Sequence, residues 1–370
     1  MATRHYRAGI AGDTERGGYG HGLDLACQGI PEIEVLAVAD PDPDGRAAAA
    51  RRVSAARSYA TWEEMLDREA LDLLVIATGW VSLHLPMLLA AAERGIHVYC
   101  EKPFLHTPAE ADQVLRVAAR TGARIAVAHQ ARAVPIIRQL QAMIDGGAIG
   151  RLRGMRGYGK CDPRAGGQDL LWLGQHVLDL MRAFGGEVAW VQAHVTVDGR
   201  DAGPADVREG TQGVGLIAGN VVRAYFAYPS GIAGTFESAM LTPSGGSYLS
   251  LLLEGTEGLI SLRSFGDQNV YRYPRPVVLP GLGDEWERVI PDEPAPTTES
   301  VHHFGNRVLM RDLLAAAETG RQPLSSGADA LATLELVMAI YESQRLGGRV
   351  ALPLRAREHA LARPAAAGVK

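Results

Sequence analysis

Residues 8–24 read AGIAGDTERGGYGHGLD, a short apolar strand that runs directly into a glycine-rich turn. Such a turn lets backbone N–H groups approach the pyrophosphate of a dinucleotide. Gly12, Gly17 and Gly18 supply the glycines, and Thr14 stands where the second glycine of a strict G-x-G-x-x-G motif belongs. A flexible glycine-rich loop would contain the same residues. The strand before the turn and the helical pattern after it favour dinucleotide binding.

The first 130 residues alternate between short apolar strands and helical segments. Strands are expected at 7–12, 34–40, 71–78, 95–100 and 123–129. This alternation predicts an α/β protein that begins with a parallel, doubly wound sheet of the Rossmann type.

After residue 130 the pattern changes to strand-like segments separated by turn signals, which predicts a large, mostly antiparallel sheet. Two helices are expected at about 300–320 and 327–347, after a proline-rich exposed loop at 274–298. The predicted domains are a nucleotide-binding domain at 1–130, an α+β domain at 131–355 and a tail at 356–370.

Composition excludes several classes of protein. The net charge of −5 argues against a general nucleic-acid binder, which would carry a basic excess. The three cysteines have no close spacing, so neither a disulfide framework nor a metal site is expected. No apolar stretch of 18 residues and no signal-type segment is present in the sequence, so we expect a cytoplasmic protein without a membrane span.

The second strand ends at Asp40, at the usual offset of roughly 20 residues from the glycine-rich turn once a short insertion is allowed. An acidic residue at this position hydrogen-bonds the adenosine ribose and disfavours a 2′-phosphate. A cap for the next helix is the alternative role, but Asp42 or Asp44 could provide that equally well. We therefore interpret Asp40 as the ribose ligand.

Two further stretches contain candidate catalytic residues. Glu101 and Lys102 follow a buried strand and precede a proline, which a solvated charge pair at a strand end would also explain. In GGQDLLWLGQHVLDLM, residues 166–181, a regular α-helix would align His176 with Asp169, Trp172 and Asp179. A histidine flanked by carboxylates can relay a proton, although a structural histidine on a half-buried helix is the alternative.

Three motifs together resemble the Gfo/Idh/MocA oxidoreductases over nearly the whole chain. They are EKP at 101–103, the G-x-H-x-x-D core within 166–179, and IATGWVSLH at 76–84. The resemblance implies an N-terminal Rossmann domain joined to an α/β domain with a large open sheet. In the family that sheet commonly forms the oligomer interface, so a homodimer or homotetramer is implied.

The resemblance also implies functional residues. Lys102 reaches the nicotinamide end of NAD and the substrate hydroxyl, where a cation stabilises a developing alkoxide. His176 matches the catalytic base of the family. The cofactor-binding residues implied by the glycine-rich turn and the motifs are Gly12, Thr14, Gly17, Gly18, Asp40, Thr78, His84, Glu101 and Lys102.

One position departs from the family pattern. An aspartate commonly lies four residues before the catalytic histidine, but here that residue is Trp172. Asp169 and Asp179 are the available replacements, and Asp179 is the better candidate because it lies three residues from His176. We therefore expect Asp179 to orient His176 and Trp172 to stack on a sugar ring.

The expected activity is NAD-dependent oxidation of a secondary hydroxyl of a sugar, polyol or related cyclic alcohol. One alternative is glycoside cleavage through transient oxidation and elimination. A second is a dinucleotide-binding regulator without catalysis, against which the intact Lys102 and His176 argue. Lys160 and Arg164 precede the helix and are candidate substrate contacts, although a solvated loop would explain them equally well.

Overall fold

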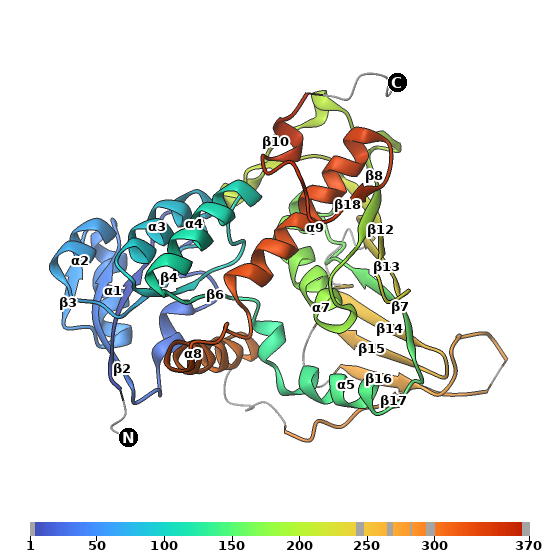
Figure 1. The fold of residues 1–370 in the computed structure, drawn as a ribbon, viewed down its shortest axis with the longest axis horizontal. Helices are drawn as coiled ribbons and strands as arrows, with labels where there is room; N and C mark the ends of the chain where they lie inside the picture. Colours follow the sequence, from blue (N-terminus) through green and yellow to red (C-terminus); the bar gives the residue numbers. More distant parts are fainter. Residues whose placement is uncertain (1–3, 242–247, 265–268, 282, 294–299, 365–370) are drawn as a thin grey trace. The chain divides into compact units, whose positions relative to one another are not determined.

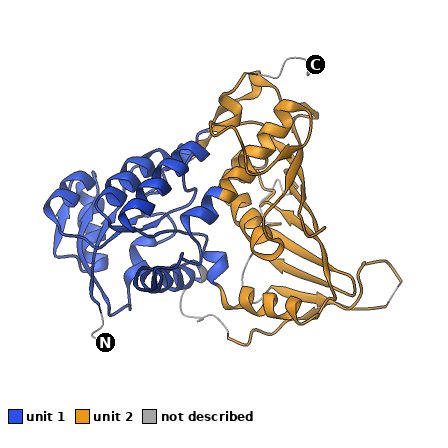
Figure 2. Cartoon of the chain, viewed as in Figure 1, with its two compact units in different colours: residues 1–133, 212–215, 297–331 blue, residues 134–211, 216–296, 332–370 orange. Residues whose placement is uncertain are grey.

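The computed structural model describes residues 4–241, 248–264, 269–281, 283–293 and 300–364. The chain forms two compact units (Figure 2). The first contains residues 1–133, 212–215 and 297–331, and the second contains 134–211, 216–296 and 332–370. Whereas the predicted domains are continuous segments, the first unit also includes two segments from late in the chain.

A six-stranded parallel sheet forms the centre of the first unit, in the order β3-β2-β1-β4-β5-β6 (Figure 1). Its strands are β1 (Tyr6–Ala11), β2 (Ile33–Ala39), β3 (Arg57–Tyr59), β4 (Leu73–Ile76), β5 (His97–Cys100) and β6 (Ile125–Val127). The sheet confirms the predicted Rossmann architecture. Of these six strands, only β3 has no counterpart among the predicted ones, because it is three residues long and lacks an apolar run.

Side-chain caps start four of the five α-helices that begin in the described part of the first unit and end there, and α3 (His84–Glu93) is the exception. They are α1 (Pro43–Val53), α2 (Trp62–Arg68), α3 (His84–Glu93), α4 (Pro108–Thr121) and α8 (Val301–Thr319), with short 3-10 helices η1 (Leu23–Cys27), η2 (Val81–Leu83) and η3 (Gln130–Ala133). Thr107 and Glu110 form a reciprocal capping box at the start of α4. Asp42 caps α1 by accepting a hydrogen bond from Gly45 N at 2.5 Å, so Asp40 is not the cap.

The glycine-rich turn leads into a short helix. A helical segment is expected after the turn, but η1 is a 3-10 helix of five residues. A helix this short leaves the backbone N–H groups of the turn itself as the donors for a bound phosphate.

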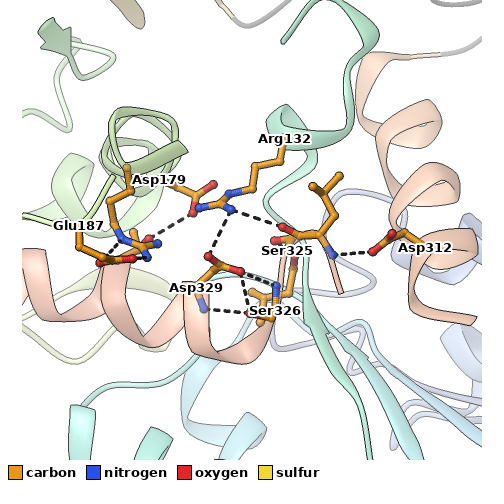
Figure 3. A network of polar contacts seen from close by, with 11 residues as sticks. Arg132, Asp179, Glu187, Asp312, Ser325, Ser326 and Asp329 are labelled. Atoms are coloured by element: carbon orange, nitrogen blue, oxygen red, sulfur yellow. Dashed lines mark hydrogen bonds and ion pairs between the residues drawn. The ribbon is translucent and has the colours of Figure 1, made fainter. Parts of the chain in front are cut away.

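Helix α8 belongs to the first unit although residues 134–211 and 216–296 of the second unit lie between β6 and α8 in the chain. Its Asn306 accepts a hydrogen bond from the buried Tyr99 hydroxyl of β5 at 2.8 Å. The turn after α8 is held by Asp312, which accepts from Leu324 N at 2.5 Å. Figure 3 shows how Arg132 and Ser326 meet at Asp329 in the next turn, at 3.3 Å and 2.6 Å respectively.

A ten-stranded mixed sheet forms the centre of the second unit, with the path β17-β16-β15-β14-β7-β13-β12-β8-β18 and β9 paired to β8. The strands are β7 (Leu152–Tyr158), β8 (Trp190–Val197), β9 (Arg200–Asp201), β12 (Val221–Ala227), β13 (Ala233–Ser238), β14 (Ser250–Gly255), β15 (Leu259–Arg263), β16 (Val270–Tyr273), β17 (Glu287–Arg288) and β18 (Val350–Ala351). Among the described strands of this sheet, only the β7–β13 pair is parallel, which matches the predicted mostly antiparallel sheet.

Helices cover one face of this sheet. They are α5 (Pro135–Asp145), α6 (Gly167–Asp169), the π-helical turn η4 (Leu170–Gly174), α7 (Gln175–Gly185) and α9 (Gly327–Leu346), of which 327–331 belong to the first unit. Helix α7 lies so close to β7 that a Cβ on Gly157 would come within 2.4 Å of Val177. Along β12, buried Val222, Ala224 and Phe226 alternate with more exposed residues, so the opposite face of the sheet is open.

Short elements complete the second unit. They are β10 (Arg208–Glu209), which pairs with β11 (Leu216–Ile217), and the 3-10 helices η5 (Pro204–Asp206), η6 (Thr211–Gly213) and η7 (Ala360–Ala362), of which η6 crosses into the first unit. The predicted loop at 274–298 contains β17, and residues 282 and 294–298 of it lie outside the described residues. The predicted tail contains η7 and is described as far as residue 364. Within the described ranges no helix is long and apolar enough to cross a bilayer.

The contact between β5 and α8 generates a prediction for stability. Tyr99→Phe deprives the Asn306 side-chain oxygen of the Tyr99 hydroxyl donor in a buried site, so we expect the free energy of unfolding to fall by about 1–3 kcal/mol. Urea denaturation measures this change. Tyr248→Phe is the control, because Tyr248 is 48% exposed. Equal stability of the two variants would contradict the prediction.

Candidate active site

The turn after β1 is shaped for a ligand. Asp13 and Gly18 exchange two backbone hydrogen bonds, at 3.2 and 2.7 Å. Gly17 has a φ of 80°, and a Cβ there would lie 2.8 Å from the backbone of Gly79, so only glycine fits. The side of Gly18 is open, because a Cβ added there would have no atom of the described residues within 4 Å. The backbone of the turn is therefore accessible to a phosphate.

A pocket of about 160 Å³ lies beside this turn in the first unit. Its lining includes Gly12, Asp13, Arg16, Asp40, Trp62 and Met87. Its lining combines apolar side chains with acidic residues, which suits an adenosine because the base needs an apolar contact and the ribose needs hydrogen-bond partners. The residues present thus fit a dinucleotide.

Asp40 lies at the end of β2 and is fully buried. Its carboxylate accepts hydrogen bonds from Thr14 N at 3.1 Å, Thr14 Oγ1 at 2.8 Å, Tyr19 Oη at 2.9 Å and Asp42 N at 2.9 Å. Burial, and next the hydrogen bond to Asp40, raises the pKa of Tyr19, so the phenol remains a donor. Asp40 and Thr14, both predicted cofactor contacts, therefore bind each other and fix the turn.

Thr78 and His84 hold the loop after β4. The Thr78 hydroxyl donates to Arg16 O at 2.6 Å, which ties this loop to the glycine-rich turn. The His84 ring is fully buried, with Nε2 2.8 Å from Thr78 O and Nδ1 3.0 Å from Phe104 O. Burial lowers the pKa of His84 more than the two carbonyl groups raise it. A neutral imidazole can donate a hydrogen bond to only one of these two carbonyl groups. Both contacts of the His84 ring are with the backbone.

This burial gives His84 a pH-dependent effect on stability. In the unfolded chain His84 takes up a proton below about its ordinary pKa of 6.5, whereas the folded chain takes it up only at lower pH. The free energy of unfolding therefore decreases as the pH falls below about 6.5, with a limiting slope of about 1.4 kcal/mol per pH unit for one proton. We expect His84→Gln to reduce this slope in urea denaturation between about pH 5 and pH 7. A variant of the exposed His5, His5→Gln, is the control, and an unchanged slope in His84→Gln would contradict the assignment.

Glu101 and Lys102 lie at the carboxyl end of β5. Both side chains are almost fully buried, at 1% and 2% exposed. Glu101 Oε1 lies 2.7 Å from His21 Nδ1 on the glycine-rich turn. The charge pair of the sequence motif is thus not a solvated surface feature.

The second unit contains the segment with His176. A regular α-helix was expected over 166–181, but α6 and α7 are separated by the π-helical turn η4. Trp172 lies in this turn and is half-buried, and His176 is 6% exposed in the first turn of α7. A π-helical turn contains more residues than an α-helical one, so Asp169 and His176 are not on the common face that 100° per residue predicts. Such turns occur frequently at functional sites.

Two buried carboxylates flank His176 in the sequence, and each contacts another element. Asp179 is fully buried, and its Oδ1 accepts from Thr333 Oγ1 of α9 at 3.2 Å. Asp169 accepts from Ser238 Oγ of β13 at 2.6 Å, and burial raises its pKa. The role of Asp179 in orienting His176 remains a prediction.

Lys160 and Arg164 share one carboxylate. Asp162 Oδ2 lies 3.3 Å from Lys160 Nζ and 2.6 Å from an Arg164 terminal nitrogen. The Arg164 guanidinium is the main cause that lowers the pKa of Asp162 to about 2. One carboxylate therefore partly compensates the charge of both cations.

Comparisons with known proteins identify the family. Residues 7–129 match "Oxidoreductase family, NAD-binding Rossmann fold", and residues 160–352 match "Oxidoreductase family, C-terminal alpha/beta domain". The chain belongs to the Gfo/Idh/MocA oxidoreductase family. This membership confirms the resemblance seen in the motifs, and the description of the first domain confirms NAD as the cofactor.

Named relatives in this family are sugar dehydrogenases. The chain is 28% identical to levoglucosan dehydrogenase of Pseudarthrobacter phenanthrenivorans over 248 residues, which cover 60% of this chain and 63% of that one. It is 26% identical to D-apiose dehydrogenase of Paraburkholderia graminis over 350 residues, 88% and 85% of the two chains. The first match thus covers less than two thirds of the relative, whereas the second covers most of it.

Solved structures agree on the fold. A levoglucosan dehydrogenase in complex with NADH and levoglucosan superimposes with a TM-score of 0.76 and 22% identity, covering 95% of this chain and 100% of that one. This likeness confirms the Gfo/Idh/MocA architecture of a Rossmann domain followed by a domain with a large sheet.

Sequence reasoning overlooked two residues of the glycine-rich turn. Tyr19 binds Asp40, and His21 binds Glu101. Both partners are distant along the chain, and His21 is 80 residues from Glu101. The only available signal was the presence of two large side chains among glycines, in GGYGHG at 17–22.

Proposed function

We propose that this protein is an NAD-dependent dehydrogenase that oxidises a secondary hydroxyl of a sugar, polyol or related cyclic alcohol. The observation that carries the proposal is a buried lysine, Lys102, at the end of β5 in an NAD-binding Rossmann unit. The names of the relatives support the substrate class, since they are dehydrogenases of levoglucosan, D-apiose and scyllo-inositol.

Each proposed step assigns one task to a side chain. Bound NAD supplies the acceptor for the hydride that leaves the carbinol carbon. Lys102 holds the hydroxyl oxygen and stabilises the negative charge that develops on it. His176 takes the hydroxyl proton, because imidazole exchanges protons near neutral pH. Asp179 supports the ring of His176 from the next turn of α7, and Trp172 offers an apolar face to a sugar ring.

Net formation of NADH tests the reaction class. A dehydrogenase accumulates one NADH for each alcohol oxidised, whereas cleavage of a glycoside through transient oxidation returns the hydride and accumulates none. The absence of an aspartate at position 172 keeps this second reaction as an alternative. Incubation with NAD and a panel of polyols, sugars and glycosides, followed by NADH absorbance and product analysis, separates the two reactions. Absence of turnover with tight NAD binding would favour a regulator.

The two assigned side chains generate a kinetic prediction. Lys102→Ala and His176→Ala should each lower turnover by roughly 10²–10⁴, the effect of losing a charge-stabilising or acid–base group. Both variants should still bind NAD, as measured by calorimetry. His5→Ala is the control, because His5 is exposed and has no role in the proposed reaction. Normal turnover of His176→Ala would show that this histidine is structural.

Asp40 generates a prediction for cofactor choice. A buried carboxylate at the ribose position repels a 2′-phosphate, so NAD should bind more tightly than NADP by about 1 kcal/mol or more. Asp40→Asn removes the charge and should reduce this preference, whereas Tyr19→Phe removes one hydrogen bond and leaves the charge. Calorimetric titration of both cofactors measures the difference. Equal affinities for NAD and NADP in the unmodified protein would overturn the assignment.

We also propose a cytoplasmic homodimer or homotetramer that associates through the open face of the ten-stranded sheet. This face carries Tyr225, which is 40% exposed and lies 5.4 Å from Trp190 between ring centroids. Aromatic side chains of this kind are enriched in protein interfaces. Light scattering of the purified protein measures the oligomeric state.

A further inference from the structure

A cavity of about 250 Å³ in the second unit takes no part in the function proposed above. It is larger than an engineered apolar cavity of about 150 Å³ that holds benzene, so a small ring can enter it. Among the described residues that line it, none is a candidate site residue. The lining residues belong to β8, the stretch 201–207, Ala218, the end of α9 and the segment 360–363.

Most of the lining is apolar. Val195, Ala218 and Ala360 are 0%, 3% and 3% exposed, and Val207 and Leu361 extend this apolar surface. An apolar group gains about 25 cal/mol for each Å² of its surface that leaves water. The cavity therefore favours a ligand that carries a ring or a branched apolar group.

Hydrogen bonds from α9 hold the walls of the cavity in place. Gln344 joins two of them, because its Oε1 accepts from Val195 N at 2.8 Å and its Nε2 donates to Ala202 O at 3.3 Å. Arg345 fixes the end of the chain by donating from Nη1 to Pro364 O at 2.9 Å. A ligand would therefore enter a site that is already formed, and little ordering of the chain would oppose its binding.

Two arginines at this cavity share one carboxylate. Arg345 donates to both Glu342 oxygens, at 2.8 and 2.7 Å, and Arg363 Nη1 donates to Glu342 Oε1 at 2.8 Å. The hydrogen bond from Arg345 is the main cause that lowers the pKa of Glu342, so this carboxylate is ionised and compensates one of the two positive charges. Within the described part of the chain Arg363 makes this one side-chain hydrogen bond, which leaves most of its five N–H donors available.

The other charged residue of the lining is Asp201. Its side chain is 73% exposed and lies 2.7 Å from His194 Nε2, so solvent screens its charge. The side chains of Arg345 and Arg363 are 15% and 31% exposed, and their excess positive charge is screened less. The cavity therefore favours an anion.

A buried hydroxyl group supplies a further donor. Tyr341 of α9 lines the cavity and is 1% exposed. Burial raises the pKa of Tyr341 more than the Ala218 backbone and Arg208 lower it, so the hydroxyl keeps its proton. This proton has no acceptor among the described residues, although buried polar groups are nearly always hydrogen-bonded. A carboxylate oxygen of a ligand would provide the acceptor.

We propose that this cavity binds a small carboxylate with an aromatic or branched apolar body. The apolar body contacts Val195, Ala218 and Leu361, and the carboxylate accepts hydrogen bonds from Arg363 and the Tyr341 hydroxyl. Hydrogen bonds between charged groups are the stronger ones, so Arg363 contributes more to the affinity than Tyr341. All of these residues belong to the second unit, and the inference does not rest on the proposed function.

The test uses benzoate as the probe and compares it with benzamide, which has the same shape without the charge. In titration calorimetry benzoate should bind at least roughly 10-fold more tightly than benzamide, because an ionised acceptor strengthens each hydrogen bond. Arg363→Gln should weaken benzoate binding roughly 10-fold, and Tyr341→Phe should weaken it roughly 3- to 10-fold. Urea denaturation of each variant shows whether it is folded.

Arg355→Gln is the matched control. Arg355 is an exposed arginine near the same end of the chain and does not line the cavity, so this variant should bind benzoate as tightly as the unmodified protein. Equal affinities for benzoate and benzamide, or an unchanged benzoate affinity in both Arg363→Gln and Tyr341→Phe, would overturn the proposal. Loss of benzoate binding in Lys102→Ala would place the anion in the candidate active site, and that result would also refute it.

Discussion

The first unit depends on one buried carboxylate, Asp40 at the end of β2. Removing a carboxylate from water without partners costs several kcal/mol. Donors from Thr14, Tyr19 and Asp42 satisfy its oxygens, and the first two belong to the glycine-rich turn. The carboxylate and the turn therefore stabilise each other. Thr14 and Tyr19 fix the start and the middle of the turn through Asp40. The end of the turn therefore lies beside Glu101, where His21 contacts the carboxylate.

Much of the fold could be predicted because its signals are local. Apolar runs marked five of the six parallel strands. Strand β3 was not predicted, since its position depends on pairing with β2 rather than on its own side chains. The sequence also does not predict that α8 belongs to the first unit, because the Tyr99–Asn306 hydrogen bond joins residues 207 positions apart.

The residues of the candidate site also fall into two groups, those with a local sequence signal and those whose contacts are distant along the chain. Gly17, Gly18 and Lys102 could be proposed from the sequence, because a glycine-rich turn and an EKP motif are visible in short stretches of it. The partners that determine their chemistry were not found, because Tyr19 and His21 contact residues on other strands. The π-helical turn before His176 was also missed. A sequence with leucine, tryptophan and glycine in helical spacing does not reveal that one turn has widened.

Trp172 is an uncharged residue between two buried carboxylates of the same helical segment, Asp169 and Asp179. Asp169 and Asp179 are already buried at 1% and 0% exposed, and each accepts a hydrogen bond from a hydroxyl group, Ser238 or Thr333. Burial already raises the pKa of Asp169. A third carboxylate at position 172, between these two, would add like-charge repulsion in a region of low polarity. Trp172 therefore adds no charge between two carboxylates that the fold already buries.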